Sequence, residues 1–185
     1  MKIARFLLSH IQDGSNILDF GCGNLNLARE LVRNNPGLTI TGIDVIEDQN
    51  LERDSLPDNL RFVQYKGREL PFPADSFSLV IASSAMHHTH DPEYYFSEFN
   101  RILKEHGEVL LVEEMYLNPF DRLVISAQDW LLNKMKKGVP VPLNFRSYKH
   151  YVQLFDQKGF NIKYEGSIRP GFPFVHHYVF RLQKK

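Results

Sequence analysis

The sequence contains a single cysteine, Cys22, among its 185 residues. One cysteine cannot form a disulfide within the chain, and free thiols are typical of reducing compartments, so we expect a cytoplasmic location. Cys22 stands between Gly21 and Gly23 in a turn-like setting, which favours a small buried side chain over a redox centre.

Neither sign of charge is in excess, since 22 Lys and Arg balance 22 Asp and Glu. A chain without net charge creates no overall field that attracts nucleic acid or an anionic membrane. Basic residues are concentrated only at 134–137, and no appended recognition module is evident, so we expect no nucleic-acid partner. A protein substrate stays open at this point.

Long apolar runs are also missing, and none approaches the roughly 20 residues that span a bilayer. We therefore expect no stable membrane insertion. The first residues lack the apolar core and cleavage site of a signal peptide. Ile3, Phe6, Leu7 and Ile11 instead recur at helical spacing, which predicts a packed leading helix, with a membrane-surface anchor as the alternative.

The most informative segment runs from Ile17 to Leu25, where an apolar strand leads into a turn with two glycines and then a helix. Glycine lets backbone N–H groups approach a ligand closely, and a helix N-terminus presents unpaired donors. A second strand ends at Asp44, roughly the 20 residues further on that recognition of a ribose requires. This pattern predicts a cofactor that contains adenosine.

Strands and helices alternate up to about residue 115. Further strands are expected at 61–65, 77–82 and 108–113, and the polar connection 47–60 leaves room for little helix. Asp91 and Pro92 suit the start of a helix that we expect to end at Gly107. With 43% hydrophobic residues, the pattern predicts one α/β domain over residues 1–185, a mainly parallel sheet with helices on both faces.

The remainder of the chain breaks this rhythm. Asn118 and Asp121 suit a helix start, a second helix is expected from Ser147 to about Lys158, and 160–165 and 174–180 are expected to pair as a C-terminal antiparallel hairpin. After Asn118, apolar residues recur on one side of the expected helix, which is most often the side packed in a core. They are Leu123, Val124, Ala127, Trp130, Leu131 and Met135.

Four motifs in this order resemble the class I S-adenosylmethionine-dependent methyltransferases, in particular the group called methyltransferase type 11. They are the glycine turn at 17–23, Asp44 after the second strand, the segment 70–77 (LPFPADSF), and His87-His88 followed by Asp91-Pro92 and Arg101 to Gly107. The resemblance covers residues 15–115. It implies a Rossmann-like class I methyltransferase fold.

The resemblance also implies S-adenosylmethionine as cofactor and S-adenosylhomocysteine as product. Asp44 would accept hydrogen bonds from the ribose, Gly21 and Gly23 would admit the amino-acid end of the cofactor, and Asp19 would orient that end. The full set of cofactor residues that it implies is Asp19, Gly21, Gly23, Asn24, Asp44, Val45, Lys66, Gly67 and Ser83.

Two positions depart from the family pattern. Leu25 stands where a third glycine is usual, and Lys66 stands where the family has an acid that contacts adenine. These departures support an alternative, a noncatalytic binding or scaffold domain with the same fold. A nicotinamide-dependent oxidoreductase is less favoured, because its glycine pattern requires glycine at position 26, which is Asn26 here.

Methyl transfer to oxygen or nitrogen can require a base, and imidazole titrates in a suitable range. His87 and His88 follow the fourth strand at the ligand-binding edge of the sheet, so either is a candidate catalytic base; supporting the loop is the plainer alternative. His90 and Asp91 complete a cluster whose spacing fits no defined metal site, so we expect no metal. His176 and His177 are expected to point to opposite faces of the hairpin and to be exposed.

Residues 116–146 are the candidate lid or substrate-selecting insertion. We expect Tyr116, Trp130 and Arg146 to contact a small-molecule or lipid-like acceptor, while the atom methylated and the oligomeric state stay open. Four basic residues, Lys134, Lys136, Lys137 and Arg146, suit an anionic acceptor, although a solvated basic face is the more common outcome.

Overall fold

The structure is a computed structural model that describes residues 2–48, 51, 53–66, 68–133, 144–168 and 177–185. Within these ranges the strands form one sheet in the order β3-β2-β1-β4-β5-β7-β6. The strands are β1 (Asn16–Phe20), β2 (Thr39–Asp44), β3 (Leu60–Gln64), β4 (Phe77–Ser83), β5 (Leu103–Glu114), β6 (Phe160–Ile168) and β7 (His177–Lys184).

Neighbouring strands from β3 to β5 pair in parallel, whereas β7 is antiparallel to both β5 and β6. The predicted parallel sheet with a C-terminal antiparallel hairpin is therefore confirmed. The helices are α1 (Lys2–Leu8), α2 (Asn26–Asn34), α3 (Pro92–Ile102), α4 (Pro119–Asn133) and α5 (Tyr148–Gln157), with short 3-10 turns η1 (Arg53–Ser55) and η2 (Met86–His88).

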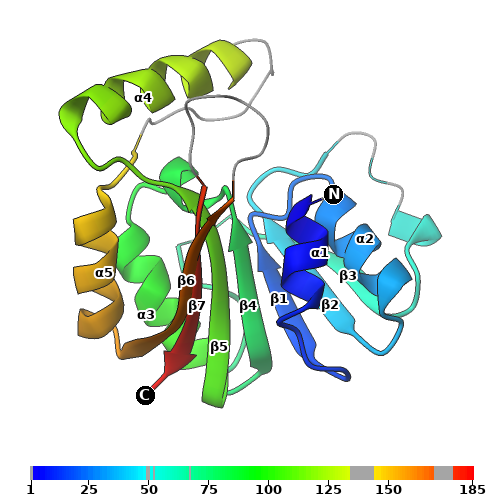
Figure 1. The fold of residues 1–185 in the computed structure, drawn as a ribbon. Coiled ribbons are helices and arrows are strands. Elements are labelled where there is room, and N and C mark those ends of the chain that lie inside the picture. The colour runs from blue at the N-terminus through cyan, green and yellow to red at the C-terminus, as the bar shows by residue number, and fades with distance from the viewer. Residues whose placement is uncertain (1, 49–50, 52, 67, 134–143, 169–176) are drawn as a thin grey trace.

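Helices cover both faces of the sheet, as predicted (Figure 1). Alternating side chains of the central strands divide between two cores, because successive strand residues point to opposite faces. One core packs Leu18, Val80 and Leu111 against α3 and α5. The other packs Ile17 and Ile81 with α1 and α2. Figure 1 shows α1 and α2 on one side of the sheet and α3 and α5 on the other.

The 70–77 segment is held by α3 through polar contacts. Glu98 accepts a hydrogen bond from the backbone N–H of Leu70 (2.9 Å), and Arg101 donates to the carbonyls of Phe72 (2.7 Å) and Leu70 (3.1 Å). Glu98 and Arg101 also form an ion pair at 2.7 Å. This sequence motif thus fixes a loop against a helix, which is a structural role.

The boundary between α3 and β5 differs from the prediction. Asp91 caps α3 as expected, accepting from the Tyr94 N–H at 2.9 Å, but the helix ends at Ile102 instead of Gly107. Leu103 is fully buried and pairs with Phe77, and the ladder resumes at Glu108. Strand pairing of a buried leucine has overridden local helix signals here.

The apolar stripe predicted for α4 is not in the core. Leu123 is 67% exposed and Trp130 49% exposed, whereas Ile125 is buried against Phe145. Leu131 and Met135 lie outside the residues whose side chains are described. α4 therefore packs on the domain through the side that carries Ile125, which is opposite to the side predicted from helical spacing.

The prediction that His177 is exposed is wrong, and His176 lies outside the described residues. The antiparallel register places His177 opposite Glu114, and its ring Nε2 lies 3.1 Å from Glu114 Oε1 with 8% of the residue exposed. α5 begins as predicted, with the Ser147 hydroxyl accepting from the His150 N–H at 3.1 Å. Among the described residues, we find no helix long and apolar enough to cross a membrane.

Candidate active site

A cavity of about 910 Å³ opens at the carboxyl ends of β1 and β4. The chain leaves β1 toward β2 and β3 and returns to β4 on the other side, so this is the switch point at which open α/β sheets bind ligands. Its volume is in the range of ligand pockets. It is lined by Phe20, Gly21, Gly23, Asp44, Val45, Ile46, Asp48, Tyr65, Arg68, Ser84, Ala85, His88, Thr89, His90, Asp91 and Tyr95.

The glycine turn forms one wall of the cavity. Gly21 has a φ of 70° and Gly23 a φ of 52°, a left-handed backbone that glycine adopts without steric cost. A Cβ on Gly21 would lie 2.5 Å from the Cβ of Ala85, so glycine also allows the loops after β1 and β4 to meet. The turn is anchored by the Gly21 N–H, which donates to the Ile43 carbonyl at 2.9 Å.

Asp44 is fixed in place by backbone donors. Its Oδ2 accepts from the Gly23 N–H at 2.8 Å and its Oδ1 from the Ile46 N–H at 3.1 Å. Each carboxylate oxygen has a further acceptor site, so the side chain still has capacity for two hydroxyl donors. Beside it, Val45 and Ile46 remain 46% and 40% exposed and give the cavity an apolar wall.

Asp19 lies in β1, next to the glycine turn, and is 2% exposed. Its Oδ2 is a buried oxygen without a hydrogen-bond partner among the described residues. Burial, and secondarily the nearby Asp44 carboxylate, raises the pKa of Asp19 to about 7. A buried carboxyl oxygen without a hydrogen-bond partner costs free energy, which a bound donor or cation would reduce.

Leu25 occupies the third glycine position and keeps its backbone conformation, with a φ of 62°. A left-handed conformation costs a non-glycine residue about 1–2 kcal/mol, which the full burial of this side chain offsets. Gly42 makes the room, because a Cβ there would lie 2.2 Å from Leu25 Cδ2. The turn therefore accommodates a leucine at this position.

Several predicted cofactor residues lie elsewhere. Lys66 is exposed and does not line the cavity, and Gly67 lies outside the described residues. Asn24 lines a smaller hollow of about 370 Å³ beside the cavity. Ser83 ends β4, and it is its neighbour Ser84, with a φ of 52°, that lines the cavity.

His87 is a buried partner of Glu113. Its Nδ1 pairs with Glu113 Oε1, and the other carboxylate oxygen accepts from the Met86 N–H at 2.8 Å. Burial opposes ionisation of Glu113, but the His87 charge, its hydrogen bond and those from backbone N–H groups outweigh it and lower the pKa of Glu113. His87 is 3% exposed and does not line the cavity.

His88 does line the cavity, beside Thr89 and His90. The His87 and His88 rings are in contact, with centroids 4.1 Å apart. Of the two candidate bases, only His88 lines the cavity. Within the described part of the chain, no group of His, Cys, Asp and Glu is arranged to hold a metal ion, and His90 and Asp91 form no such cluster.

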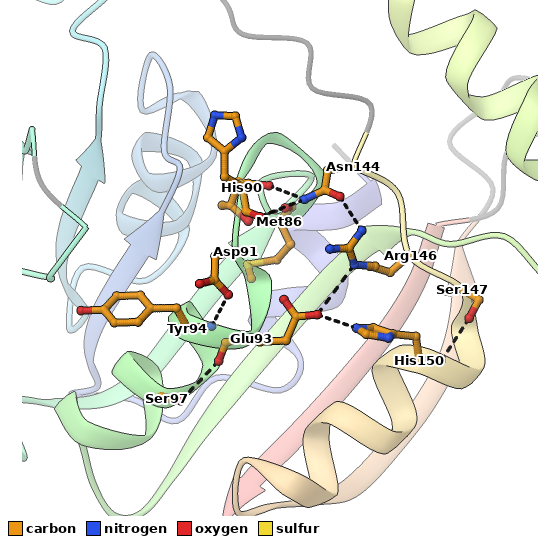
Figure 2. A network of polar contacts seen from close by, with 11 residues as sticks. Met86, His90, Asp91, Glu93, Tyr94, Ser97, Asn144, Arg146, Ser147 and His150 are labelled. Carbon is orange, nitrogen blue, oxygen red and sulfur yellow. Dashed lines mark hydrogen bonds and ion pairs between the residues drawn. The ribbon is translucent and has the colours of Figure 1, made fainter.

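A polar network ties the cavity rim to the segment before α5 (Figure 2). Asn144 donates to the carbonyls of Thr89 (2.8 Å) and His90 (3.4 Å). Its side-chain oxygen accepts from Arg146, whose Nε lies 3.8 Å from Glu93. His150 Nε2 lies 2.9 Å from the same carboxylate oxygen. The 144–150 segment thus holds the loop that carries His88.

The three predicted substrate residues do not line the cavity. Arg146 takes part in the network just described, Tyr116 packs with Ile125 and Phe145, and Trp130 is half-exposed on α4. Tyr65, Arg68 and Tyr95 line the cavity but were not predicted as site residues from the sequence. Tyr65 directly follows β3, so its place after a parallel strand was the available signal.

A comparison with known families matches residues 1–165 to the family described as methyltransferase domain. The chain belongs to this family. The sheet order, the glycine turn and Asp44 agree with the class I S-adenosylmethionine-dependent fold that the motifs predicted.

Two similar proteins of known name are themselves methyltransferases. The methyltransferase domain is 35% identical over 117 residues to sterol 24-C-methyltransferase ERG6B of Gibberella zeae, covering 60% of this chain and 30% of that protein. It is 28% identical over 154 residues to the ubiquinone/menaquinone biosynthesis C-methyltransferase UbiE of Vibrio parahaemolyticus, covering 78% and 59%. The chain thus spans between about a third and three fifths of the length of these relatives.

A solved structure shows the same fold. The 1,6-didemethyltoxoflavin-N1-methyltransferase of Burkholderia thailandensis, determined with 1,6-didemethyltoxoflavin and S-adenosylhomocysteine, superposes with a TM-score of 0.78 at 14% identity, covering 100% of this chain and 77% of that one.

The methyltransferase domain also has the features that the cofactor requires. Asp44 keeps acceptor sites free for the ribose hydroxyls, and Val45 and Ile46 offer apolar contact. Asp19 does not line the cavity, but it lies two residues before Gly21, which does, and its oxygen without a partner among the described residues suits a ligand with a cationic amino group. The residues present therefore fit S-adenosylmethionine.

Proposed function

We propose that this domain transfers a methyl group from S-adenosylmethionine to a small-molecule or lipid-like acceptor. The observation that carries the proposal is the cavity at the β1 and β4 ends, in which a preorganised Asp44 and His88 line the same space. The sterol and quinone acceptors named for the relatives support the acceptor class.

The roles that we propose follow the chemistry of each group. When bound, S-adenosylmethionine supplies an electrophilic methyl group and leaves as S-adenosylhomocysteine. Asp44 holds the ribose, Gly21 and Gly23 let the backbone approach, and the Asp19 carboxylate orients the cationic amino group. Alignment of acceptor and methyl group provides most of the rate enhancement.

His88 is the proposed proton acceptor for an acceptor atom that must lose a proton. His88 lines the cavity, whereas the neighbouring His87 is buried and paired with Glu113. A base in this position contributes about 10²–10⁴-fold where proton removal is required. The proposal leaves the methylated atom as O, N or C.

Further parts of the proposal concern the chain as a whole. We propose one domain over residues 1–185, with 116–146 as a lid or acceptor-selecting segment, and a cytoplasmic location. The network from Asn144 to the His90 carbonyl supports the lid, because it connects this segment to the cavity rim. The buried, unpaired Cys22 thiol supports the location.

The test is transfer of a labelled methyl group from S-adenosylmethionine to trial acceptors, a quinol and a sterol. We expect turnover with at least one acceptor, and for O or N acceptors a loss of about 10²-fold or more in kcat in His88→Gln, with cofactor affinity retained. Binding of S-adenosylhomocysteine without turnover on any acceptor would favour the noncatalytic alternative.

A further inference from the structure

The α4 helix and Leu117, two residues before it, carry the most exposed large hydrophobic side chains of the described chain. Leu117 is 65% exposed, Phe120 72%, Leu123 67% and Trp130 49%. Large hydrophobic residues elsewhere in the described chain reach at most 46%. A concentration of exposed apolar side chains on one element marks an interaction surface.

These side chains share one face of the helix. Phe120, Leu123 and Trp130 are separated by three and seven residues, so they lie within about a quarter turn of one another around the axis. Ile125 points to the other side, where it packs on Phe145 and Tyr116. The helix is thus attached to the domain by one face and presents aromatic and aliphatic groups on another, here called the α4 face (Leu117, Phe120, Leu123 and Trp130).

The sequence after α4 is basic, whereas α4 itself has Asp121 and Asp129 against Arg122. Between Trp130 and Phe155 the chain has no Asp or Glu but five Lys and Arg, in a protein whose total charge is zero. The basic residues are Lys134, Lys136, Lys137, Arg146 and Lys149. Apolar and aromatic residues on one face with a surplus of Lys and Arg nearby are the features of a helix that lies in the interface of a membrane.

The α4 face lies at the same edge of the sheet as the cavity. Figure 1 shows α4 across the edge of the sheet at which β4 and β5 end, the edge where the cavity opens. Contacts link the two: Ile125 of α4 packs on Phe145, whose ring stacks on His87 at 4.8 Å. The adjacent Asn144 bonds the cavity rim at Thr89 and His90.

We propose that the α4 face docks on an anionic lipid bilayer and thereby brings the cavity to acceptors dissolved in that bilayer. Phe120, Leu123 and Trp130 enter the interface, and the surplus of Lys and Arg in the sequence after α4 favours anionic over neutral headgroups. The inference rests on the proposed function for its acceptor class. It concerns peripheral docking only, with no segment crossing the bilayer.

The experiment uses the full chain and its own reporter, since Trp130 is the single tryptophan. Flotation is measured with phosphatidylcholine vesicles and with vesicles that contain about 30% phosphatidylglycerol. We expect flotation with the anionic vesicles, a blue shift of Trp130 emission, and quenching by brominated lipid. High salt and pure phosphatidylcholine should both weaken binding.

Variants locate the surface. Phe120→Ser with Leu123→Ser should reduce flotation at least about 10-fold, whereas Ile162→Ser, which removes a 38% exposed side chain from β6, should leave it unchanged. Both variants change exposed positions, so thermal unfolding should match the parent closely. Equal flotation of the double variant and the parent would overturn the proposal.

A second copy of the chain is the competing occupant. If Trp130 emission shifts with protein concentration alone and sedimentation shows a dimer that the double variant abolishes, the lipid proposal is overturned. Calorimetry with S-adenosylhomocysteine on the same samples separates this inference from the proposed function. Intact cofactor binding without flotation overturns only the docking, and flotation without cofactor binding overturns only the proposed activity.

Discussion

Asp44 is the residue on which we expect cofactor binding to depend most directly. Its carboxylate is fixed by the N–H groups of Gly23 and Ile46 and still faces the cavity. We predict that Asp44→Asn weakens binding of S-adenosylhomocysteine about 10–100-fold, because a hydrogen bond to a charged acceptor contributes about 1.5–3 kcal/mol. Titration calorimetry measures this, with the exposed Asp54→Asn as control. Unchanged affinity in Asp44→Asn would remove its proposed role.

Asp19 gives the ligand-free protein a pH-dependent stability. Its pKa is about 7 in the fold against an ordinary value of 3.8, so the folded state binds more protons than the unfolded state between these values. This contribution is fully present below about pH 4 and is lost as the pH rises through about 7. We predict that the melting temperature of the parent falls more steeply from pH 4 to pH 8 than that of Asp19→Asn. If the melting temperatures of the parent and Asp19→Asn change in parallel with pH, the pKa of Asp19 is not raised.

At the residue level, the sequence indicated part of the cavity wall. Asp44 and the two turn glycines line the cavity, and strand ends and glycine spacing are visible in the sequence; their contacts with a cofactor stay predictions. The sequence did not show that the Leu25 side chain packs where Gly42 has no side chain, because the two residues belong to different elements. The same holds for Glu113, the partner of His87, which is supplied by the next strand.

At the scale of elements, the ion pair between His87 of η2 and Glu113 of β5 fixes η2 against the sheet. Removing one partner of a buried ion pair leaves the other uncompensated and costs about 3–5 kcal/mol. We predict a loss of this size in the free energy of unfolding for Glu113→Ala, measured with urea. Glu105→Ala, whose side chain is 88% exposed, should be close to neutral. A loss below about 1 kcal/mol in Glu113→Ala would contradict this account.

Element boundaries were predicted well where capping chemistry is local and less well where packing decides. Asp91 and Ser147 begin α3 and α5 as expected. The end of α3 was predicted too late because Leu103 pairs with the sheet. The exposed side of α4 was predicted wrongly because helical spacing identifies a row of apolar residues but not what packs against it.

At the scale of the whole molecule, the strand order creates the cavity, and a ligand filling it should stabilise the entire domain. Binding to the folded state alone contributes about 2.7 kcal/mol at a ligand concentration 100 times its Kd, which is roughly 5–10 °C for a domain of this size. We predict a rise of this order with S-adenosylhomocysteine in thermal unfolding, and no rise with NADH. The reverse pattern would favour the oxidoreductase alternative.

The central claim is that the cavity between β1 and β4 is an S-adenosylmethionine site, and the most direct measurement is calorimetric titration of the full chain with S-adenosylmethionine, S-adenosylhomocysteine and NADH. The account predicts one-to-one binding of the first two and none of the third. A folded protein that binds neither S-adenosylmethionine nor S-adenosylhomocysteine would contradict it.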